Sequence, residues 1–456
     1  MTLRFSHIVA EQRRYFYSGR TMSIAFRREQ LRRLRKAVVA NEKSILKALN
    51  RDLSKAPYEA YMSEVGIVLS ELRYALRHLR SWSRPVRVRT PLTIFPAASF
   101  IHTEPYGVTL VISPWNYPFA LTINPLIGAI AAGNCCIVKV SEFAPNTAAV
   151  LTHMIADMFA TEYITVVSGD AEVGQALLEE PFDKIFFTGS TAVGRAVMAA
   201  AAKNLTPISL ELGGKSPCIV DRDASLVDAA RKIGSGKFLN AGQTCIAPDY
   251  LLVHRSVKED LVTLLQDTIH QFYGNNPQQS KDFNRIVNHR HFDRLIRLMA
   301  DGQIIFGGDR DRKALYIGPT IIDDVGWDDV IMREEIFGPL LPIMTFDHLD
   351  EAIEKLKSLP KPLALYFFSS NRRNQLAVLH GISFGGGCIN DTMLHYASPY
   401  LPFGGVGQSG IGSYRGKASF DAFSHRKSVV RRPPRFDFPF RYPPYGSLSL
   451  IKKILR

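Results

Sequence analysis

Short apolar runs alternate with amphipathic stretches between residues 107 and 202, and this alternation constrains the fold of the chain more than any other feature. The apolar runs cover residues 107–113, 136–140, 165–168 and 184–188, and helical patterns cover residues 120–132, 147–159, 174–178 and 193–202. This pattern is typical of a parallel sheet covered by helices on both faces. A second series runs from residue 208 to about residue 389, with strands predicted near residues 216–220, 250–253, 341–346 and 364–368. The sequence therefore predicts an α/β protein.

The segments before residue 107 have different patterns. Between residues 26 and 82, apolar side chains such as Leu31, Leu34 and Val38 recur with a period near 3.6, which predicts two or three amphipathic helices. An Arg-rich transit peptide is the alternative for residues 1–36, but the apolar period continues into the second helix, so we interpret the N-terminal charge as a solvated helix face. Residues 85–105, rich in Thr, Val and Phe with prolines near both ends, predict a hairpin or a pair of edge strands.

The net charge of +14 is confined to the two ends of the chain. Residues 1–40 carry a net +8 and residues 431–456 a net +6, so the middle of the chain is neutral. Because that middle part has neither a basic stripe nor an aromatic RNA-binding motif, nucleic-acid binding is not expected. No run of about 18 apolar residues is present, which argues against an integral membrane protein. Five cysteines without metal-site spacing argue against a disulfide framework and against zinc, and predict a reducing compartment, the cytoplasm.

Cys245 and Glu211 are the side chains best suited to covalent chemistry. Cys245 lies in the sequence GQTCIA (residues 242–247), a small-residue turn between a predicted helix and a strand. Such a cysteine is either a small buried apolar residue or a nucleophile whose pKa is lowered by nearby backbone N–H groups. Glu211 ends an apolar strand and precedes two glycines. It is either solvated or held in a crevice that raises its pKa toward that of a general base.

Asn116 follows the predicted strand at residues 107–113, in the sequence SPWNYP (residues 113–118). Ligands of open α/β sheets bind beyond the carboxyl ends of their strands. The amide of Asn116 either forms a turn or donates a hydrogen bond to an oxyanion, the group that forms when a thiol attacks a carbonyl carbon.

A dinucleotide site is suggested by the sequence FTGSTAVG (residues 187–194), which follows a strand and enters a helix. Backbone N–H groups at such a helix start can bind a pyrophosphate. Lys139 and Glu142 end the preceding strand, where they could hold ribose hydroxyls. The chain also contains one literal GxGxxG motif at residues 405–410, but no strand and helix flank it as that motif requires, so we interpret it as a loop.

Together these segments resemble the aldehyde dehydrogenase superfamily, over essentially the whole chain. The matching pieces, in the order typical of the family, are SPWNYP, AAGN, KVSE, FTGSTAVG, ELGGKSP, GQTCIAPDY, EEIFGP and PFGGVGQSG. The sequences near Cys245 and after residue 388 resemble those of the class 3 branch, whose members oxidise aromatic and medium- or long-chain aliphatic aldehydes. Two positions depart from the usual pattern: Val140 replaces a proline, and Ala192 stands where many branches carry glutamate. Neither touches the expected chemistry.

The resemblance implies a role for each matching residue. Cys245 would be the nucleophile, Glu211 the base that activates water, and Asn116 together with the Cys245 N–H the oxyanion hole. The implied cofactor is NAD, with NADP possible, and no metal is implied. The cofactor-binding residues would be Ser113, Trp115, Lys139, Glu142, Gly189, Ser190, Gly194, Glu335 and Phe337.

The resemblance also implies a domain organisation and a homodimer. Residues 1–84 and 106–208 would form a Rossmann-type dinucleotide-binding domain with N-terminal helices, and residues 209–392 an α/β catalytic domain. Residues 85–105 and 420–442 would supply oligomerisation strands, and residues 443–456 a basic tail. In that C-terminal region we expect Phe436, Phe438, Phe440 and Tyr442 to pack against the body or a second subunit, with at most weak, salt-sensitive contact to a membrane surface.

Two other functions remain open on the sequence. A CoA-acylating relative would pass the acyl group to a thiol, but Glu211 argues against it, because only water needs a hydrolytic base. A non-catalytic binding protein on the same fold would not need Cys245, Glu211 and Asn116 together. We therefore expect NAD(P)-dependent oxidation of a small-molecule aldehyde to a carboxylic acid.

Overall fold

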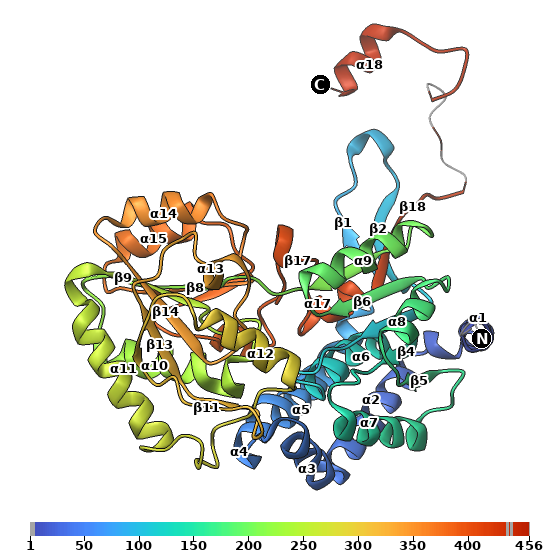
Figure 1. Ribbon diagram of the computed structural model, residues 1–456. Helices are drawn as coiled ribbons and strands as arrows, with labels where there is room; N and C mark the ends of the chain where they lie inside the picture. Colours follow the sequence, from blue (N-terminus) through green and yellow to red (C-terminus); the bar gives the residue numbers. More distant parts are fainter. Residues whose placement is uncertain (1–4, 435–436, 438–440, 456) are drawn as a thin grey trace.

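The computed structural model describes the chain except for residues 1–4, 435–436, 438–440 and 456. Two sheet-containing units lie side by side, with N-terminal helices below the junction between them and a narrow sheet projecting above (Figure 1). The predicted α/β architecture is confirmed. The helical and strand segments expected from the sequence are present, most with ends shifted by no more than three residues.

The first sheet has the strand order β17-β7-β6-β3-β4-β5 and is parallel except for β17. Its strands are β3 (Val108–Ile112), β4 (Cys135–Lys139), β5 (Ile164–Val167), β6 (Lys184–Thr188), β7 (Ile208–Glu211) and β17 (Gly410–Ile411). The chain leaves β3 towards β4 and β5, then returns to place β6 on the other side of β3. The order therefore reverses between β3 and β6, the place where open α/β sheets bind ligands beyond their carboxyl ends.

The helices of this unit are α6 (Ala120–Ala132), α7 (Pro145–Met158), α8 (Ala171–Leu178) and α9 (Thr191–Ala202). Every residue of α6 is buried, so this helix has no solvent face. Strands β3 and β4 are also almost entirely buried, which explains why they are continuous apolar runs and not alternating ones.

The second sheet has the order β10-β13-β14-β9-β8-β15-β16, and only the β10–β13 pair is antiparallel. Its strands are β8 (Pro217–Val220), β9 (Tyr250–His254), β10 (Gln303–Phe306), β13 (Thr320–Asp323), β14 (Leu340–Phe346), β15 (Ala364–Phe368) and β16 (Gly386–Ile389). Its main helices are α10 (Leu226–Phe238), α11 (Lys258–Tyr273), α12 (His289–Leu298), α14 (Leu349–Lys357) and α15 (Arg372–Gly381). The sequence did not predict β10, β13, β16 or β17, because these strands are short and three of them contain glycines or lie at an edge.

The N-terminal region is helical, as its apolar period predicts. It forms α1 (Ser6–Tyr17), α2 (Ile24–Ala40), α3 (Glu42–Leu53), α4 (Pro57–Ala60), a single π-helical turn η2 (Tyr61–Val65) and α5 (Gly66–Trp82). Most of the described Arg and Lys side chains of residues 1–40 are exposed or half-buried, in line with a solvated helix face, but buried charges also occur in this region. Arg27 is buried, and its guanidinium donates to the carbonyl oxygens of Thr21, Met22 and Ala131. Lys55 and Glu64 are fully buried as well.

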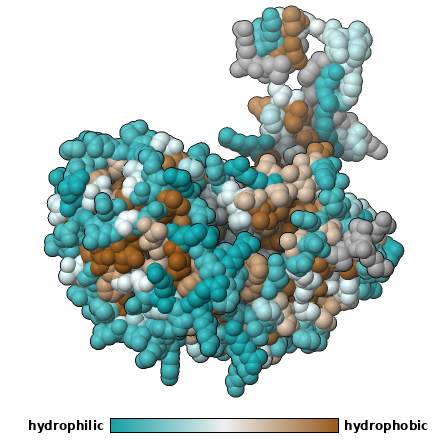
Figure 2. Space-filling view, in the orientation of Figure 1, coloured by the Kyte–Doolittle hydropathy of each residue, from teal (hydrophilic) through white to brown (hydrophobic). Residues whose placement is uncertain are grey.

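The projecting sheet is formed by β1 (Val86–Val88), β2 (Ala98–Pro105) and β18 (Ser424–Arg431), all antiparallel. Figure 2 shows apolar side chains on this part, which stands clear of the body. Beyond it, Tyr442 is half exposed, and its hydroxyl donates to Asp437 in the same segment. Phe436, Phe438 and Phe440, expected to pack there, lie outside the described residues. A last helix, α18, covers Leu448–Leu455, and none of the helices among the described residues is long and apolar enough to cross a membrane.

Candidate active site

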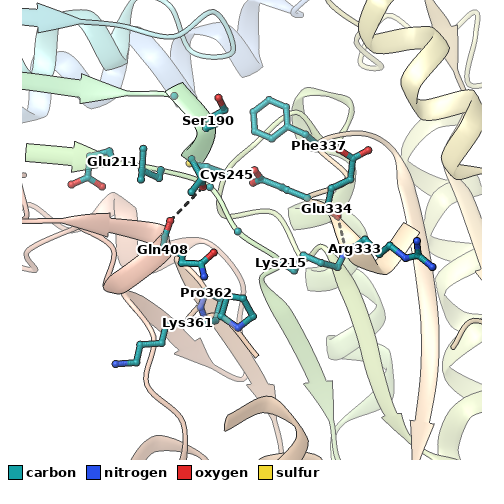
Figure 3. A pocket seen from close by; sticks show the side chains of 18 of the residues that line it. Ser190, Glu211, Lys215, Cys245, Arg333, Glu334, Phe337, Lys361, Pro362 and Gln408 are labelled. Carbon is teal, nitrogen blue, oxygen red and sulfur yellow. Dashed lines mark hydrogen bonds between the residues drawn. The ribbon is translucent and has the colours of Figure 1, made fainter. Parts of the chain in front are cut away.

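A cavity of about 620 Å³ lies where the carboxyl ends of β3, β6 and β7 face the second sheet, and Figure 3 shows Cys245 near its centre. Eight of the residues named from the sequence line it: Trp115, Asn116, Gly189, Ser190, Glu211, Cys245, Glu335 and Phe337. They come from segments more than 200 residues apart. The reversal of strand order in the first sheet is the reason that these segments meet.

The turn that carries Cys245 follows α10 and has an unusual backbone. Asn240 and Ala241 have φ values of 53° and 51°, and Gly242 follows with φ 72°. Left-handed backbone is strained for residues other than glycine and is found most often at functional sites. At Gly242 a side chain has no room, because a Cβ would lie 2.2 Å from the carbonyl oxygen of Gly338. The turn thus presents Cys245 between a helix and a strand, as the sequence predicts.

The electrostatics of Cys245 differ from the expectation of a lowered thiol pKa. Burial raises the pKa of Cys245, and the carboxyl groups of Glu335 and Glu211 raise it further. The backbone N–H groups of Cys245 and Ile246 act in the opposite direction, but their effect is smaller. The expectation rested on nearby backbone N–H groups in general and did not include the burial of the thiol or the two carboxyl groups. In this arrangement the thiol has to give up its proton before it can act as a nucleophile.

Glu211 ends β7 and is 3% exposed, although it lines the cavity. Neither carboxyl oxygen has a hydrogen-bond partner. Burial raises the pKa of Glu211 well above its ordinary value, which is the direction expected for a general base. A carboxylate without solvation or partners has a high affinity for a proton, which is the property that a general base needs. In this structure the two oxygens are buried, and Figure 3 shows the carboxyl group directed away from Cys245, so the side chain has to turn before it can meet water in the cavity.

Asn116 is 3% exposed and is fixed to the Cys245 turn by its side chain. Its Nδ2 donates to the carbonyl oxygen of Gln243 at 3.0 Å, and the neighbouring Tyr117 hydroxyl lies 2.7 Å from that of Thr244. One amide hydrogen of Asn116 is used in this way, so the second remains for another acceptor.

The start of α9 fits a pyrophosphate. Ser190 is the N-cap, and its hydroxyl accepts from the N–H of Val193. Gly189 keeps this turn tight, because a Cβ there would lie 2.5 Å from the ring of Phe187. Gly194 does not line the cavity; a Cβ there would lie 2.5 Å from Leu212 Cδ2, so it allows α9 to pack against the end of β7.

Glu335 faces the cavity from the opposite side. A Cβ on Gly213 would lie 1.9 Å from its carboxyl oxygen, so this glycine makes room for Glu335. Burial and the nearby Asp249 raise the pKa of Glu335 to about 8, against the effects of the Gly214 N–H and Lys215. Phe337, with φ 51°, packs edge-on against Trp115, with 5.4 Å between the ring centres. The two rings form an apolar wall of the cavity.

Ser113, Lys139 and Glu142 do not line the cavity, although they follow β3 and β4. Lys139 Nζ donates to Glu142 at 2.9 Å, and the hydroxyl of Ser113 donates to the carbonyl oxygen of Lys139. Lys139 is buried and Glu142 is exposed. Ser113 therefore lies one strand away from β6, which leads into α9, and Lys139 and Glu142 lie two strands away, beside the strand-end crevice.

Several cavity residues were missed by the sequence analysis. As interpreted, the literal GxGxxG segment does not join a strand to a helix: it is a loop with a 3-10 turn, Gly407–Ser409, and it leads into β17 at Gly410. It borders the cavity through Gln408, whose carbonyl oxygen accepts from the Thr191 hydroxyl. Leu212 N–H also donates to Ser409 O, so this loop covers the end of β7. Lys361, drawn beside Gln408 in Figure 3, lines the same side. Gln408 lies within the matching piece PFGGVGQSG, but nothing in that motif places it at the cavity; tertiary packing brings Gln408 and Lys361 there. No cluster of potential metal ligands is found among the described residues.

Comparison with known proteins gives a consistent set of relatives. The sequence model of a protein family, described as "Aldehyde dehydrogenase family", matches residues 4–429. The chain is 50% identical to 4,4'-diaponeurosporen-aldehyde dehydrogenase of Staphylococcus aureus, over 98% of each chain. It is 44% identical to "Aldehyde dehydrogenase, dimeric NADP-preferring" of the dog, over 97% of this chain and 98% of that one. A solved structure, "Substrate bound state of Staphylococcus Aureus AldH", matches over all of both chains with TM-score 0.97 and 48% identity. Other relatives are family 3 aldehyde dehydrogenases of plants and mammals.

Proposed function

This chain belongs to the aldehyde dehydrogenase family, on the class 3-like branch, and we propose that Cys245, Glu211 and Asn116 carry its reaction. The enzyme oxidises aldehydes with NAD or NADP, and we propose that its products are carboxylic acids. One observation carries the proposed assignment: one cavity is lined by a thiol on a strained turn, an unpartnered buried carboxyl and an amide bonded to that turn.

In the proposed reaction, the Cys245 thiolate attacks the aldehyde carbon and forms a thiohemiacetal. The carbonyl electrons move to the oxygen, which accepts hydrogen bonds from Asn116 Nδ2 and the Cys245 N–H. Oxidation of the thiohemiacetal to a thioester is the chemistry that NAD or NADP would supply when bound, as the acceptor of the hydride that leaves the same carbon. Glu211 then takes a proton from a water molecule, and the oxygen of that water attacks the thioester carbon. The carbon–sulfur bond breaks, the thiolate returns to Cys245, and a carboxylic acid leaves.

The cofactor residues proposed from the sequence fit a dinucleotide at this cavity. Ser190, Gly189 and the start of α9 would hold the pyrophosphate, and the Trp115–Phe337 wall and Glu335 would lie against the rest. Lys139 and Glu142 would hold ribose hydroxyls at the edge of the site, supported by Ser113, and Gly194 would act through the packing of α9. The substrates we propose are aromatic or medium- to long-chain aliphatic aldehydes.

We propose that water, and not coenzyme A, receives the acyl group, because Glu211 is a buried base on the cavity wall. Purified enzyme with NAD and a panel of such aldehydes should form NADH and free carboxylic acid at the same rate with and without coenzyme A. Formation of acyl-CoA with a rate that depends on coenzyme A would contradict this proposal. Absence of NADH with every aldehyde would contradict the assignment of an active enzyme.

Replacing Asn116 by alanine should lower kcat by about a hundredfold or more, the typical loss for one oxyanion donor. Asn116 Nδ2 is the only side-chain donor assigned to the oxyanion. Its removal therefore weakens the stabilisation of the negative charge that develops there, and it leaves the binding of NAD unchanged. Steady-state kinetics and calorimetric titration with NAD measure the two effects. A variant with normal kcat and only weaker apparent affinity for the aldehyde would contradict the oxyanion role.

We propose a homodimer that pairs through the projecting sheet. Val86, Leu92 and Phe95 expose between 55% and 87% of their surface there, more than a monomer normally leaves on one narrow element. A dog relative is named as dimeric. Sedimentation should therefore give about twice the chain mass of 51.0 kDa; a particle of the mass of one chain would contradict this.

For location we propose the cytoplasm, because all five cysteines are free thiols. Any contact of the basic C-terminal segment with a membrane surface would be electrostatic, with Lys452 and Lys453 near the lipid, and moderate salt would release it. Partition of the protein into salt-washed membranes would contradict this proposal.

A further inference from the structure

Lys55 is a fully buried lysine that bonds to the main chain of the proposed oxyanion residue. It lies in the loop between α3 and α4, and its ammonium donates to the carbonyl oxygen of Asn116 at 2.8 Å and to Glu64 at 2.6 Å. The same nitrogen lies 3.9 Å from the ring centre of Tyr117. A buried ammonium is costly unless its charge is paired and its hydrogens are bonded. Here both conditions are met, and one of the partners is residue 116 itself.

Glu64 binds the segment of the chain that follows Asn116. One carboxyl oxygen accepts from Lys55, and the other accepts from the N–H groups of Phe119 and Ala120 at 2.9 and 3.1 Å. These N–H groups belong to the start of α6, where helices lack internal acceptors. Glu64 therefore binds both the lysine that holds Asn116 and the helix that follows it.

The carbonyl of Asn116 is also the point where the N-terminal helices meet the Cys245 turn. Besides Lys55, this oxygen accepts from Nδ2 of Asn240 at 2.9 Å. Asn240 is the first of the left-handed residues of that turn, and its Nδ2 also donates to Gln243 O, the acceptor of the Asn116 side chain. Two segments of the active site thus converge on one main-chain oxygen, whose second lone pair is occupied by Lys55.

We infer that Lys55 and Glu64 are positioning residues for the oxyanion site: they fix the main chain of Asn116 so that its Nδ2–H and the Cys245 N–H meet at one oxygen. Neither side chain lines the cavity, so neither touches the aldehyde. Oxyanion donors act only within a few tenths of an ångström of the correct place, which a single main-chain contact can decide. This inference rests on the proposed role of Asn116.

The test replaces Lys55 by methionine, which keeps the length of the side chain and removes the ammonium. We expect kcat and the rate of the first NADH burst to fall by about tenfold to a hundredfold, since a misplacement near 1 Å has an effect of that order. Alkylation of Cys245 by iodoacetamide, followed by mass spectrometry, should keep its rate. That reaction displaces iodide at a saturated carbon and forms no oxyanion, so an equal fall in the alkylation rate would show damage to the Cys245 turn and overturn the inference.

A double-mutant cycle separates this inference from the proposed function. If Lys55 acts through Asn116, the double variant Lys55→Met with Asn116→Ala should be no slower than Asn116→Ala alone. Losses that multiply would show that Lys55 acts by another route and would overturn the inference. Full activity of Asn116→Ala alone would instead overturn the proposed oxyanion role.

Removing Lys55 alone leaves the charge of Glu64 buried without its partner, which could destabilise the fold. The second variant therefore makes both members of the pair neutral. Lys55→Met combined with Glu64→Gln removes both charges of this ion pair and should show the same loss of kcat with unchanged NAD binding. Lys184→Met is the matched control: Lys184 is also buried, but it begins β6 at the end of the sheet away from the cavity, and its Nζ donates to Ser209. This control should keep kcat. If neither Lys55 variant binds NAD, Lys55 serves the fold and not the oxyanion site, and the inference is overturned.

Discussion

Replacing Cys245 by alanine will abolish aldehyde oxidation and leave NAD binding intact. The thiol is the only nucleophile assigned to the cavity, and no thiohemiacetal or thioester can form without it. Loss of a nucleophile that acts as one unit with its partners removes nearly all of the catalysis that the unit provides. NAD binding should persist, because the proposed contacts come from α9, Glu335 and the Trp115–Phe337 wall. NADH production and calorimetric titration measure the two outcomes on the same sample.

The matched control is Cys388→Ala. Cys388 is the other partly exposed cysteine; it lies on β16, and its Sγ is 3.6 Å from Nδ1 of His395. No role in the reaction is assigned to it, so this variant should retain its turnover. Measurable turnover of Cys245→Ala, at a rate near that of the parent enzyme, would rule out Cys245 as the nucleophile.

Replacing Glu211 by glutamine will separate the two half-reactions. The first hydride transfer does not use the base, so rapid mixing should show a burst of NADH close to one per active site. Hydrolysis of the thioester then proceeds without a base. Steady-state turnover should therefore fall by about a hundredfold or more, within the range for a lost general base. Acid quenching followed by mass spectrometry should find the acyl group on the peptide that contains Cys245.

The pH dependence supplies a second measure of Glu211. Burial raises its pKa, so the carboxyl is neutral at low pH and becomes a base only as the pH rises through the raised value. Hydrolysis of the thioester by the parent enzyme should therefore accelerate with pH, and this acceleration should be lost in Glu211→Gln. A burst that falls in proportion to turnover would instead place Glu211 in thiol activation or in the geometry of the site.

The sequence predicted most of the secondary structure and the main residues that line the cavity. Strands β6 and β15 and helix α6 begin and end as expected, since their apolar runs are long and bounded by glycine, proline or polar residues. Cys245, Glu211 and Asn116 were recognisable because Glu211 ends β7, Asn116 lies in the loop after β3, and Cys245 lies in a small-residue turn between α10 and β9. The backbone at the end of a strand is free to contact a ligand, so motifs of this kind can be recognised from neighbouring residues alone.

Other features could not be read from the sequence. Lys55 and Glu64 lie among exposed charges of the N-terminal helices, and only packing against α6 and the Cys245 turn removes them from water. Gln408 reaches the cavity because β17 pairs with β7, a contact between residues about 200 apart. Arg27 is buried because α6 ends beneath it, where its guanidinium bonds to Ala131.

The sequence by itself determined the α/β pattern, the order of the motifs and the chemical groups available for the reaction, because strands, helix starts and turns depend on neighbouring residues. The tertiary structure decided which of those groups share a cavity and how each is charged. Strand order is set by long-range pairing, and a pKa is set by what surrounds a group in space; the thiol of Cys245 and the carboxyl of Glu211 both have raised pKa values for this reason. The link from Lys55 to Asn116 spans 61 positions of sequence and exists only in the fold.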